Sequence, residues 1–136
     1  MKDIGSTIRT VYTSLLAVTY NGQSVPFYSG EPYETTPENY IYINSIDQAQ
    51  DNNDQRYANE VVVTLDVVTK TNMANDKTAV DSISNSVLTA VVGQIVDTVD
   101  FQVHIINATS NYLHQQDGTI HINRKLIRIF NRITQK

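Results

Sequence analysis

Hydrophobic residues near the start of the chain recur at the spacing of an α-helix. They stand at relative positions 0, 4, 7 and 11, and they are Ile4, Ile8, Val11 and Leu15. This spacing predicts a helix over residues 4–16 with one apolar face, and serines and threonines fill the other face. Asp3 stands in front of it, where a carboxylate can accept hydrogen bonds from the free N–H groups of the first turn.

A second helical pattern covers residues 80–95. Its apolar stripe is about 100° wide and consists of Val80, Ile83, Val87, Leu88, Val91 and Ile95. Asn75 or Asp76 is placed to cap it. Both predicted helices are therefore amphipathic, and each needs an apolar surface to cover.

Alternating apolar and polar positions predict strands over residues 40–46, 57–70 and 101–106, and a last strand from Thr119. The strand over residues 57–70 shows one apolar face, made of Val61, Val63, Leu65 and Val67. In the last strand the apolar residues change face, with Ile120 and Ile122 on one side and Ile127, Ile129 and Ile133 on the other. That change predicts a bulge or a bend near Arg124 and Lys125.

Turn-forming and polar segments separate these elements. Asn21-Gly22 predicts a type I′ hairpin turn whose second arm ends at Pro26. Residues 28–39 and 47–56 are predicted to be loops, and a polar connection through Asp117-Gly118 leads to the last strand. We therefore expect one α+β domain over residues 1–136, with a mostly antiparallel twisted sheet and two amphipathic helices packed on one face.

Composition supports a sheet-rich fold and excludes some chemistry. There are 15 Val and 14 Ile against 6 Leu, and β-branched side chains favour strands. The chain has no cysteine, so it cannot form disulfides, zinc–thiolate sites or a thiol nucleophile. No stretch approaches the ~20 apolar residues of a membrane span, and the first residues lack the apolar core of a signal peptide, so we expect no membrane partner.

The net charge of -4 conceals an uneven distribution. Residues 1–119 contain 5 Lys and Arg and 14 Asp and Glu, whereas residues 120–136 contain 5 Lys and Arg and no acid. A basic segment on an acidic body can pair with a neighbouring copy, or bind an acidic partner. Arg124, Arg128 and Arg132 could follow a phosphate backbone, but the acidic body disfavours nucleic acid, so direct binding is not expected.

Signatures of catalysis and of cofactor binding are absent from the sequence, which has only five glycines and no phosphate-binding loop. His104 and His121 fall on adjacent predicted strands and, with Asp117, could imitate a metal site, but two exposed sheet histidines are the favoured interpretation. His114 is the remaining histidine of the chain. Asp51-Asn52-Asn53-Asp54 lacks the glycine and terminal glutamate of a calcium loop. We expect no enzyme activity, no metal and no cofactor.

Tyrosines cluster in one part of the chain, at Tyr28, Tyr33, Tyr40 and Tyr42. Tyrosine combines a large apolar area with a polar tip and is enriched at protein interfaces. This cluster predicts either an interface or ordinary half-buried packing.

The order of the predicted elements resembles that of the tail-terminator or tail-completion proteins of bacteriophages, and of related neck proteins at the head–tail junction. The resemblance covers nearly the whole chain. It is carried by the helix Ile4–Leu16, Val25-Pro26, the segment from Pro37 to Ile43, the strand Tyr57–Thr69, the helix Val80–Ile95 and the basic strand Arg124–Arg132.

The resemblance implies a structural virion protein of a tail or neck, assembled in the host cytoplasm. Members of that family form rings, commonly hexamers, whose sheets meet side by side and whose loops reach other tail or head–tail connector proteins. The candidate assembly contacts are Tyr28, Tyr33, Tyr40, Asp51, Asn52, Asn53, Asp54, Arg56, Arg124, Arg128 and Arg132. The alternative is a small ligand- or peptide-binding domain with no virion role, which a deep pocket gathering His104, His121 and a carboxylate would favour.

Overall fold

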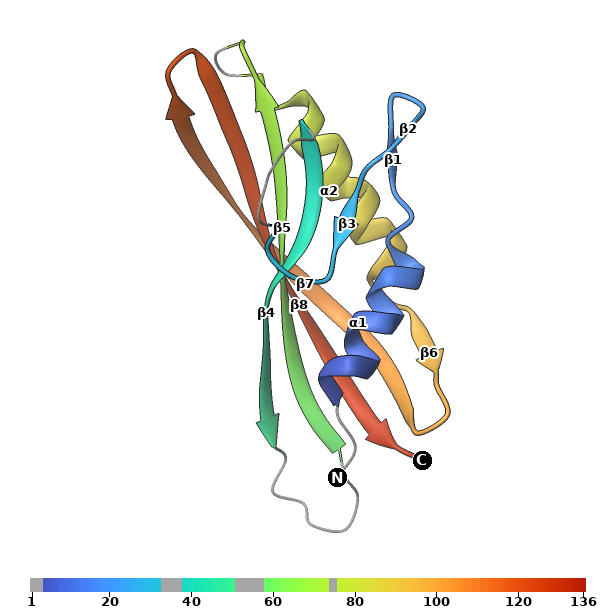
Figure 1. Cartoon of the computed structure of the whole chain (residues 1–136). Helices are drawn as coiled ribbons and strands as arrows, with labels where there is room; N and C mark the ends of the chain where they lie inside the picture. Colours follow the sequence, from blue (N-terminus) through green and yellow to red (C-terminus); the bar gives the residue numbers. More distant parts are fainter. Residues whose placement is uncertain (1–3, 33–37, 51–57, 74–75) are drawn as a thin grey trace.

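The computed structural model of the chain describes residues 4–32, 38–50, 58–73 and 76–136 (Figure 1). Two helices and eight strands are assigned within these residues. In chain order they are α1 (Ile4–Leu15), β1 (Thr19–Tyr20), β2 (Gln23–Ser24), β3 (Phe27–Tyr28), β4 (Asn39–Gln50), β5 (Ala58–Thr71), α2 (Thr78–Val91), β6 (Ile95–Asp97), β7 (Phe101–Asp117) and β8 (Ile120–Gln135).

Six strands form one sheet in the order β3-β4-β5-β8-β7-β6. Every neighbouring pair is antiparallel except β3 and β4, which are parallel. Figure 1 shows a strongly twisted sheet with α1 and α2 on the same side of it. The predicted fold class, α+β with a mostly antiparallel twisted sheet and two helices on one face, is confirmed.

The side of the sheet that the helices cover, here called the front face, contains the main core. Both helices bury their apolar stripes there. The predicted face of β5 is fully buried, and it meets the isoleucines of β8 in the same cluster. The packed front-face strand residues are Ile41, Ile43, Val61, Val63, Leu65, Val67, Phe101, Val103, Ile105, Ile127, Ile129 and Ile133.

A hydrogen-bonded polar group ties α1 to this core. Tyr12 of α1 is fully buried, and its hydroxyl donates to Oδ1 of Asn131 at 2.7 Å. The Asn131 amide in turn donates to the carbonyl oxygens of Val61 and Ile129. Because burial disfavours the charged phenolate, the pKa of Tyr12 is raised above its ordinary value of 10.0.

Both two-residue turns use a backbone with positive φ. Asn21 (φ 51°) and Gly22 (φ 76°) join β1 to β2, which confirms the predicted type I′ turn. Between β7 and β8, Gly118 has a φ of 62° and Thr119 does not share the positive φ, as in a type II′ turn. A side chain at Gly118 would strain this turn.

Several predicted boundaries are wrong. Residues 47–50 belong to β4, and the segment between Ile106 and Asp117, predicted as a polar connection, is the second half of β7. Ile95 lies in β6 and not in the second helix. Residues 27–28 form the short parallel strand β3, which the sequence pattern did not predict. The strand structure of such polar segments comes from backbone hydrogen bonds to a neighbouring strand, and the pattern of hydrophobic residues does not reveal these bonds.

The predicted bulge near Arg124 and Lys125 is also wrong. β8 pairs with β5 without any shift in register from His121 to Thr134. The apolar residues change face because Ile122 packs on the opposite side of the sheet, in a second small cluster with Tyr40, Tyr42 and Val68. The register shifts lie instead in the outer strands, at Asn44 in β4 and Ile106 in β7.

α2 begins close to the predicted cap. Its N-cap position is Lys77, and the carboxylate of Asp76, one residue earlier, accepts a hydrogen bond from the N–H of Thr78 at 3.1 Å. This bond lowers the pKa of Asp76. The other proposed caps, Asp3 and Asn75, lie outside the described residues. Within the described part of the chain, neither helix is long and apolar enough to cross a membrane.

Candidate assembly surfaces

The side of the sheet away from the helices, here called the back face, holds three of the four arginines predicted as contacts. Arg124, Arg128 and Arg132 occupy alternate positions of β8, so they share a face. The residues between them include Ile127 and Ile129, which are buried in the front-face core. The arginines therefore form a column along the back of the sheet.

Arg124 is bound within the chain. Its guanidinium forms an ion pair with the carboxylate of Asp66 on β5, and Asp66 is only 1% exposed. The Tyr42 hydroxyl donates to Oδ2 of Asp66 at 2.8 Å and accepts from Nη2 of Arg124 at 2.9 Å. The hydrogen bond to Asp66 raises the pKa of Arg124, while burial, followed by the nearby carboxylate, raises that of Tyr42.

The tyrosine cluster packs around this ion pair. The rings of Tyr40 and Tyr42 are stacked with centroids 6.1 Å apart, and Tyr28 meets Tyr40 edge to face at 6.2 Å. Tyr40 and Tyr42 are buried and Tyr28 is half-buried. Of the two interpretations of the cluster, packing inside the chain therefore accounts for Tyr40 and Tyr42 in the free subunit, and Tyr28 keeps part of its surface exposed.

Arg128 and Arg132, in contrast, are exposed. Arg128 lies between Thr64 and Thr109 across the sheet, and its guanidinium is 5.8 Å from the ring centroid of Phe130. A hollow of about 620 Å³ opens beside these residues. Its apolar lining includes Val62, Ile106 and Phe130, and its charged lining is Asp47, Glu60 and Arg132. This part of the back face offers an apolar floor and charges of both signs.

One long edge of the sheet is open. β6 pairs with β7 only from Gln102 to His104, and Ile105 adds hydrogen bonds to Gly93 and Gln94. In the described part of the chain, no strand pairs with the outer side of β7 from Asn107 to Asp117. This segment contains no lysine or proline, which are the residues that commonly protect an edge strand against pairing with another chain.

The pairing of β7 with β8 shows which backbone groups of β7 point away from β8, toward the open edge. Asp117 and Ile120 flank the two-residue turn, so they are a hydrogen-bonded pair, and the pairs alternate from there. The N–H and C=O groups that point away from β8 belong to Ala108, Ser110, Tyr112, His114 and Gln116. These residues can pair with one further strand.

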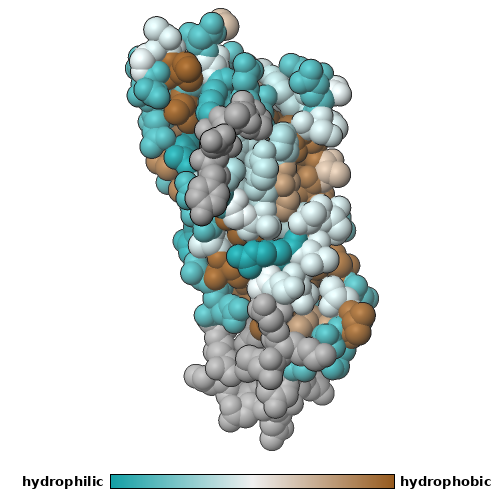
Figure 2. All heavy atoms as spheres, in the orientation of Figure 1, coloured by the Kyte–Doolittle hydropathy of each residue, from teal (hydrophilic) through white to brown (hydrophobic). Residues whose placement is uncertain are grey.

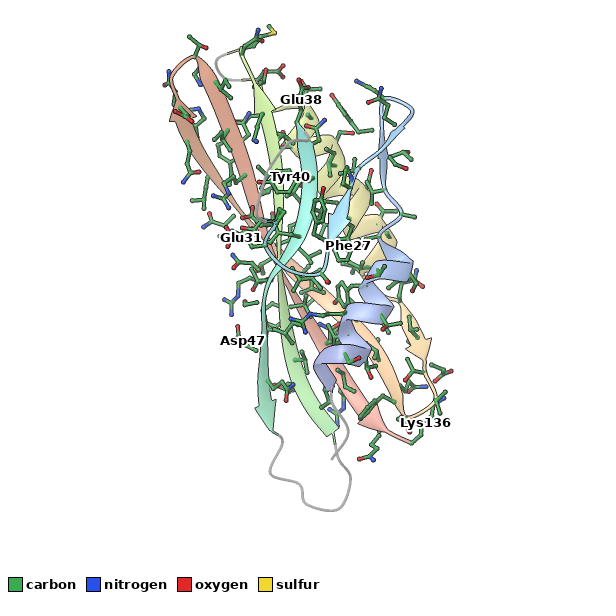
Figure 3. All side chains as sticks on the ribbon, in the orientation of Figure 1. Phe27, Glu31, Glu38, Tyr40, Asp47 and Lys136 are labelled. Atoms are coloured by element: carbon green, nitrogen blue, oxygen red, sulfur yellow. The ribbon has the colours of Figure 1, made fainter. Side chains whose placement is uncertain are left out.

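The opposite edge of the sheet is open as well. β3 covers β4 only at Ile41 and Tyr42. From Asn44 to Gln50 no strand among the described residues pairs with the outer side of β4. Asp47, in the lower half of β4 (Figure 3), lies across from Val62 on the back face. A single subunit therefore presents two different open edges on opposite sides of its sheet.

The tip of the β7–β8 hairpin exposes apolar side chains. Leu113 is 42% exposed and Ile120 is 45% exposed, and both lie on the back face by the register. Figure 2 shows a hydrophobic patch at the upper left, over this hairpin, on a mostly hydrophilic surface. The open β7 edge is thus bordered by apolar surface.

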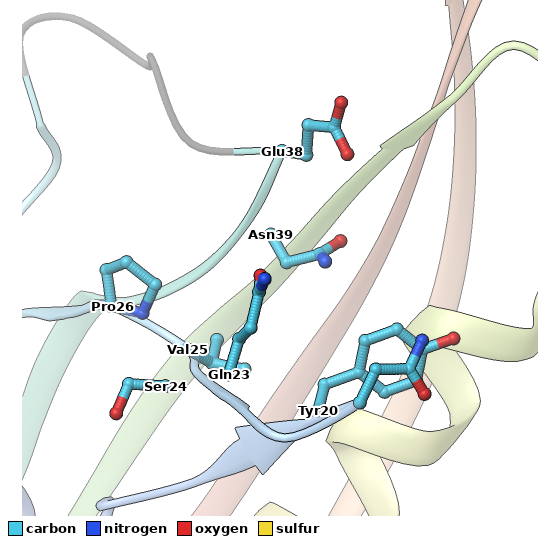
Figure 4. Close-up of a pocket in the computed structure, with 8 residues that line it drawn as sticks. Tyr20, Gln23, Ser24, Val25, Pro26, Glu38 and Asn39 are labelled. Carbon is cyan, nitrogen blue, oxygen red and sulfur yellow. The ribbon is translucent and has the colours of Figure 1, made fainter.

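A polar hollow of about 480 Å³ lies between the β1–β2 hairpin and the start of β4 (Figure 4). Its lining includes the amide side chains of Gln23 and Asn39, the ring of Tyr20 and the carboxylate of Glu38. Glu38 is the only carboxylate among these lining residues, so they do not supply a pair of carboxylates for acid–base chemistry.

The structure does not bring His104 and His121 together, which rules out the disfavoured metal-site alternative. His104 lies opposite Arg132 on the back face, whereas His121 lies opposite Gln116 near the hairpin tip. No group of three or more His, Cys, Asp and Glu that could hold a metal occurs among the described residues. Six proposed contacts, Tyr33, Asp51, Asn52, Asn53, Asp54 and Arg56, lie outside the described residues.

Comparison with known proteins gives a match by fold alone. No protein-family model matches the sequence, and no curated protein matches it. A chain in the solved structure of the virion of a native gene transfer agent particle has a similar fold, with a TM-score of 0.54 and 13% sequence identity. The match covers 93% of this chain and 85% of the virion chain.

Proposed function

We propose that this chain is a structural virion protein of a bacteriophage tail or neck, without enzyme activity, which assembles into a ring that joins or terminates the tail. A fold shared over nearly the whole chain with a component of a gene transfer agent virion supports the virion role. The ring and the tail position rest on the resemblance in element order and on the surfaces of the subunit.

The observation that carries the assembly part of the proposal is the pair of open edges. The outer side of β7 from Asn107 to Asp117 and the outer side of β4 from Asn44 to Gln50 belong to opposite sides of one sheet. A contact between two different surfaces of identical subunits is heterologous, and it forms a ring when the rotation from one subunit to the next closes after a whole number of subunits. Each subunit then receives a strand at one edge and offers one at the other.

The back face supplies further contacts in this arrangement. Arg128 and Arg132 are exposed there, while the remainder of the chain has an excess of acidic residues. Neighbouring subunits, or another tail or connector protein, can pair their acidic groups with these arginines. The resemblance favours six subunits.

The proposal is tested by the mass of the purified protein in solution. Light scattering after size-exclusion chromatography should give a multiple of the 15.3 kDa subunit mass that rises with concentration, and electron microscopy should show rings. Ser110→Pro removes an outward N–H of β7 without removing a bond to β8, so it should shift the protein to monomer.

Ser110→Ala is the matched control, because it changes the same side chain and keeps the N–H; it should assemble like the unmodified chain. A protein that stays monomeric at high concentration and in the presence of purified tail or connector proteins would contradict the assembly proposal. Rings that survive Ser110→Pro would exclude the β7 edge as the contact.

A further inference from the structure

Two histidines face each other at the tip of the β7–β8 hairpin. Nε2 of His114 and Nδ1 of His121 are 3.1 Å apart, and the ring centroids are 5.3 Å apart with 26° between the ring planes, so the rings meet through these nitrogens. His114 is exposed and His121 is half-buried. Solvent therefore reaches the pair.

The strand register explains why the rings meet. His114 lies opposite Asn123, and His121 lies opposite Gln116, so the histidines are diagonal neighbours on the front face. Diagonal neighbours in an antiparallel pair are within reach of long side chains. His121 is also paired with Thr71 of β5, which holds its backbone between two strands.

The distance between the two nitrogens suits a shared metal ion. Imidazole nitrogens bind Zn²⁺ at about 2.0–2.1 Å, so two of them at an angle of roughly 90–110° are separated by about 2.9–3.4 Å. The observed 3.1 Å falls within this range. An N–H···N hydrogen bond between the rings spans a similar distance, so metal binding has to be distinguished from it by experiment.

We propose that His114 and His121 form a two-histidine site for a divalent transition metal ion of the Zn²⁺, Ni²⁺ and Cu²⁺ group. Imidazole suits these ions, whereas Mg²⁺ and Ca²⁺ prefer oxygen ligands. No third His, Cys, Asp or Glu joins the pair among the described residues. The remaining coordination positions are filled by water or by a donor from another molecule. The site belongs to the single subunit and does not depend on ring formation.

The test is a titration of the tag-free protein with Zn²⁺ and with Ni²⁺ at neutral pH. Calorimetry should show saturable binding of one ion per chain, and NMR should show changes in the imidazole signals of both histidines. Because two ligands on one chain act with a high effective concentration, His114→Ala and His121→Ala should each weaken binding by about 100-fold.

His104→Ala is the matched control, since His104 is an exposed histidine of the same strand on the other face; it should leave the affinity unchanged. The absence of saturable binding, or an equal loss in His104→Ala, would overturn the site. Imidazole signals of the unmodified chain that do not respond to either ion would show that the pair is only hydrogen-bonded, and this readout requires no variant.

Discussion

At the scale of single residues, the ion pair with Arg124 compensates the buried negative charge of Asp66 on the back face. Arg124→Met leaves the Asp66 carboxylate buried with the Tyr42 hydroxyl as its remaining side-chain donor. Because 26% of the Arg124 side chain is exposed, water screens part of the pair, and we expect a loss of about 2–4 kcal/mol. Urea unfolding measures this loss.

A double variant separates two causes of destabilisation, the unpaired Asp66 carboxylate and the lost packing of the Arg124 side chain. Arg124→Met combined with Asp66→Leu removes both charges, so at least half of the lost stability should return. Arg132→Met, at an exposed position of the same strand, should change stability by less than about 0.5 kcal/mol. If the double variant is no more stable than Arg124→Met, the unpaired Asp66 carboxylate is not the cause of the lost stability.

The same ion pair shows what the sequence can predict about single residues. The charge pattern marked Arg124 as basic on an acidic body, and the clustering of Tyr40 and Tyr42 indicated either an interface or half-buried packing. The sequence did not connect Arg124 with Asp66, because Asp66 lies on another strand and becomes a neighbour of Arg124 only when β5 and β8 pair. Candidate side chains are visible in a sequence, but their partners depend on strand pairing.

At the scale of elements, the alternation of hydrogen bonding along β7 gives two adjacent residues, Thr109 and Ser110, different sensitivity to proline. Thr109 faces Arg128 in a pair that bonds to β8, whereas the N–H of Ser110 points to the open edge. Thr109→Pro should lose about 1–3 kcal/mol, because it removes a ladder hydrogen bond. Ser110→Pro should lose less than about 1 kcal/mol. Urea unfolding at a concentration that keeps both variants monomeric measures the difference, and equal losses would contradict the assigned phase.

Elements with strong periodicity were predictable, and elements without it were not. Both helices and β5 follow from apolar spacing, since each buries one face in the core. The second half of β7 has a polar sequence because both of its faces are largely exposed, and its strand structure comes from the bonds to β8. The open β7 edge therefore could not be identified before the fold was known.

At the scale of the whole molecule, buried tyrosines predict sensitivity to alkaline pH. The pKa values of Tyr12, Tyr40 and Tyr42 are raised, mainly by burial, above the ordinary value of 10.0. As the pH rises past about 10, the unfolded chain releases these phenol protons before the folded chain does. The contribution of these tyrosines to the free energy of unfolding should therefore be constant below that pH and fall above it, as urea unfolding between neutral and alkaline pH will show.

Tyr12→Phe tests which groups make the free energy of unfolding fall with rising pH in the alkaline range. Tyr12 is fully buried, so its replacement should make the alkaline slope shallower by up to about 1.4 kcal/mol per pH unit. Tyr20→Phe is the control, because Tyr20 is only half-buried. An alkaline slope that Tyr12→Phe does not change would show that other groups cause it.

The extra residues in β4 and β7 determine the shape of the sheet. The central strands β5 and β8 pair without a shift, while each outer strand carries one inserted residue, at Asn44 and at Ile106. An extra residue of this kind bends its strand and increases the local right-handed twist of the sheet. Because neighbouring strands of a sheet are rotated in the same sense, copies joined edge to edge are each rotated relative to the one before. A row of such subunits therefore cannot extend as a flat, straight ribbon.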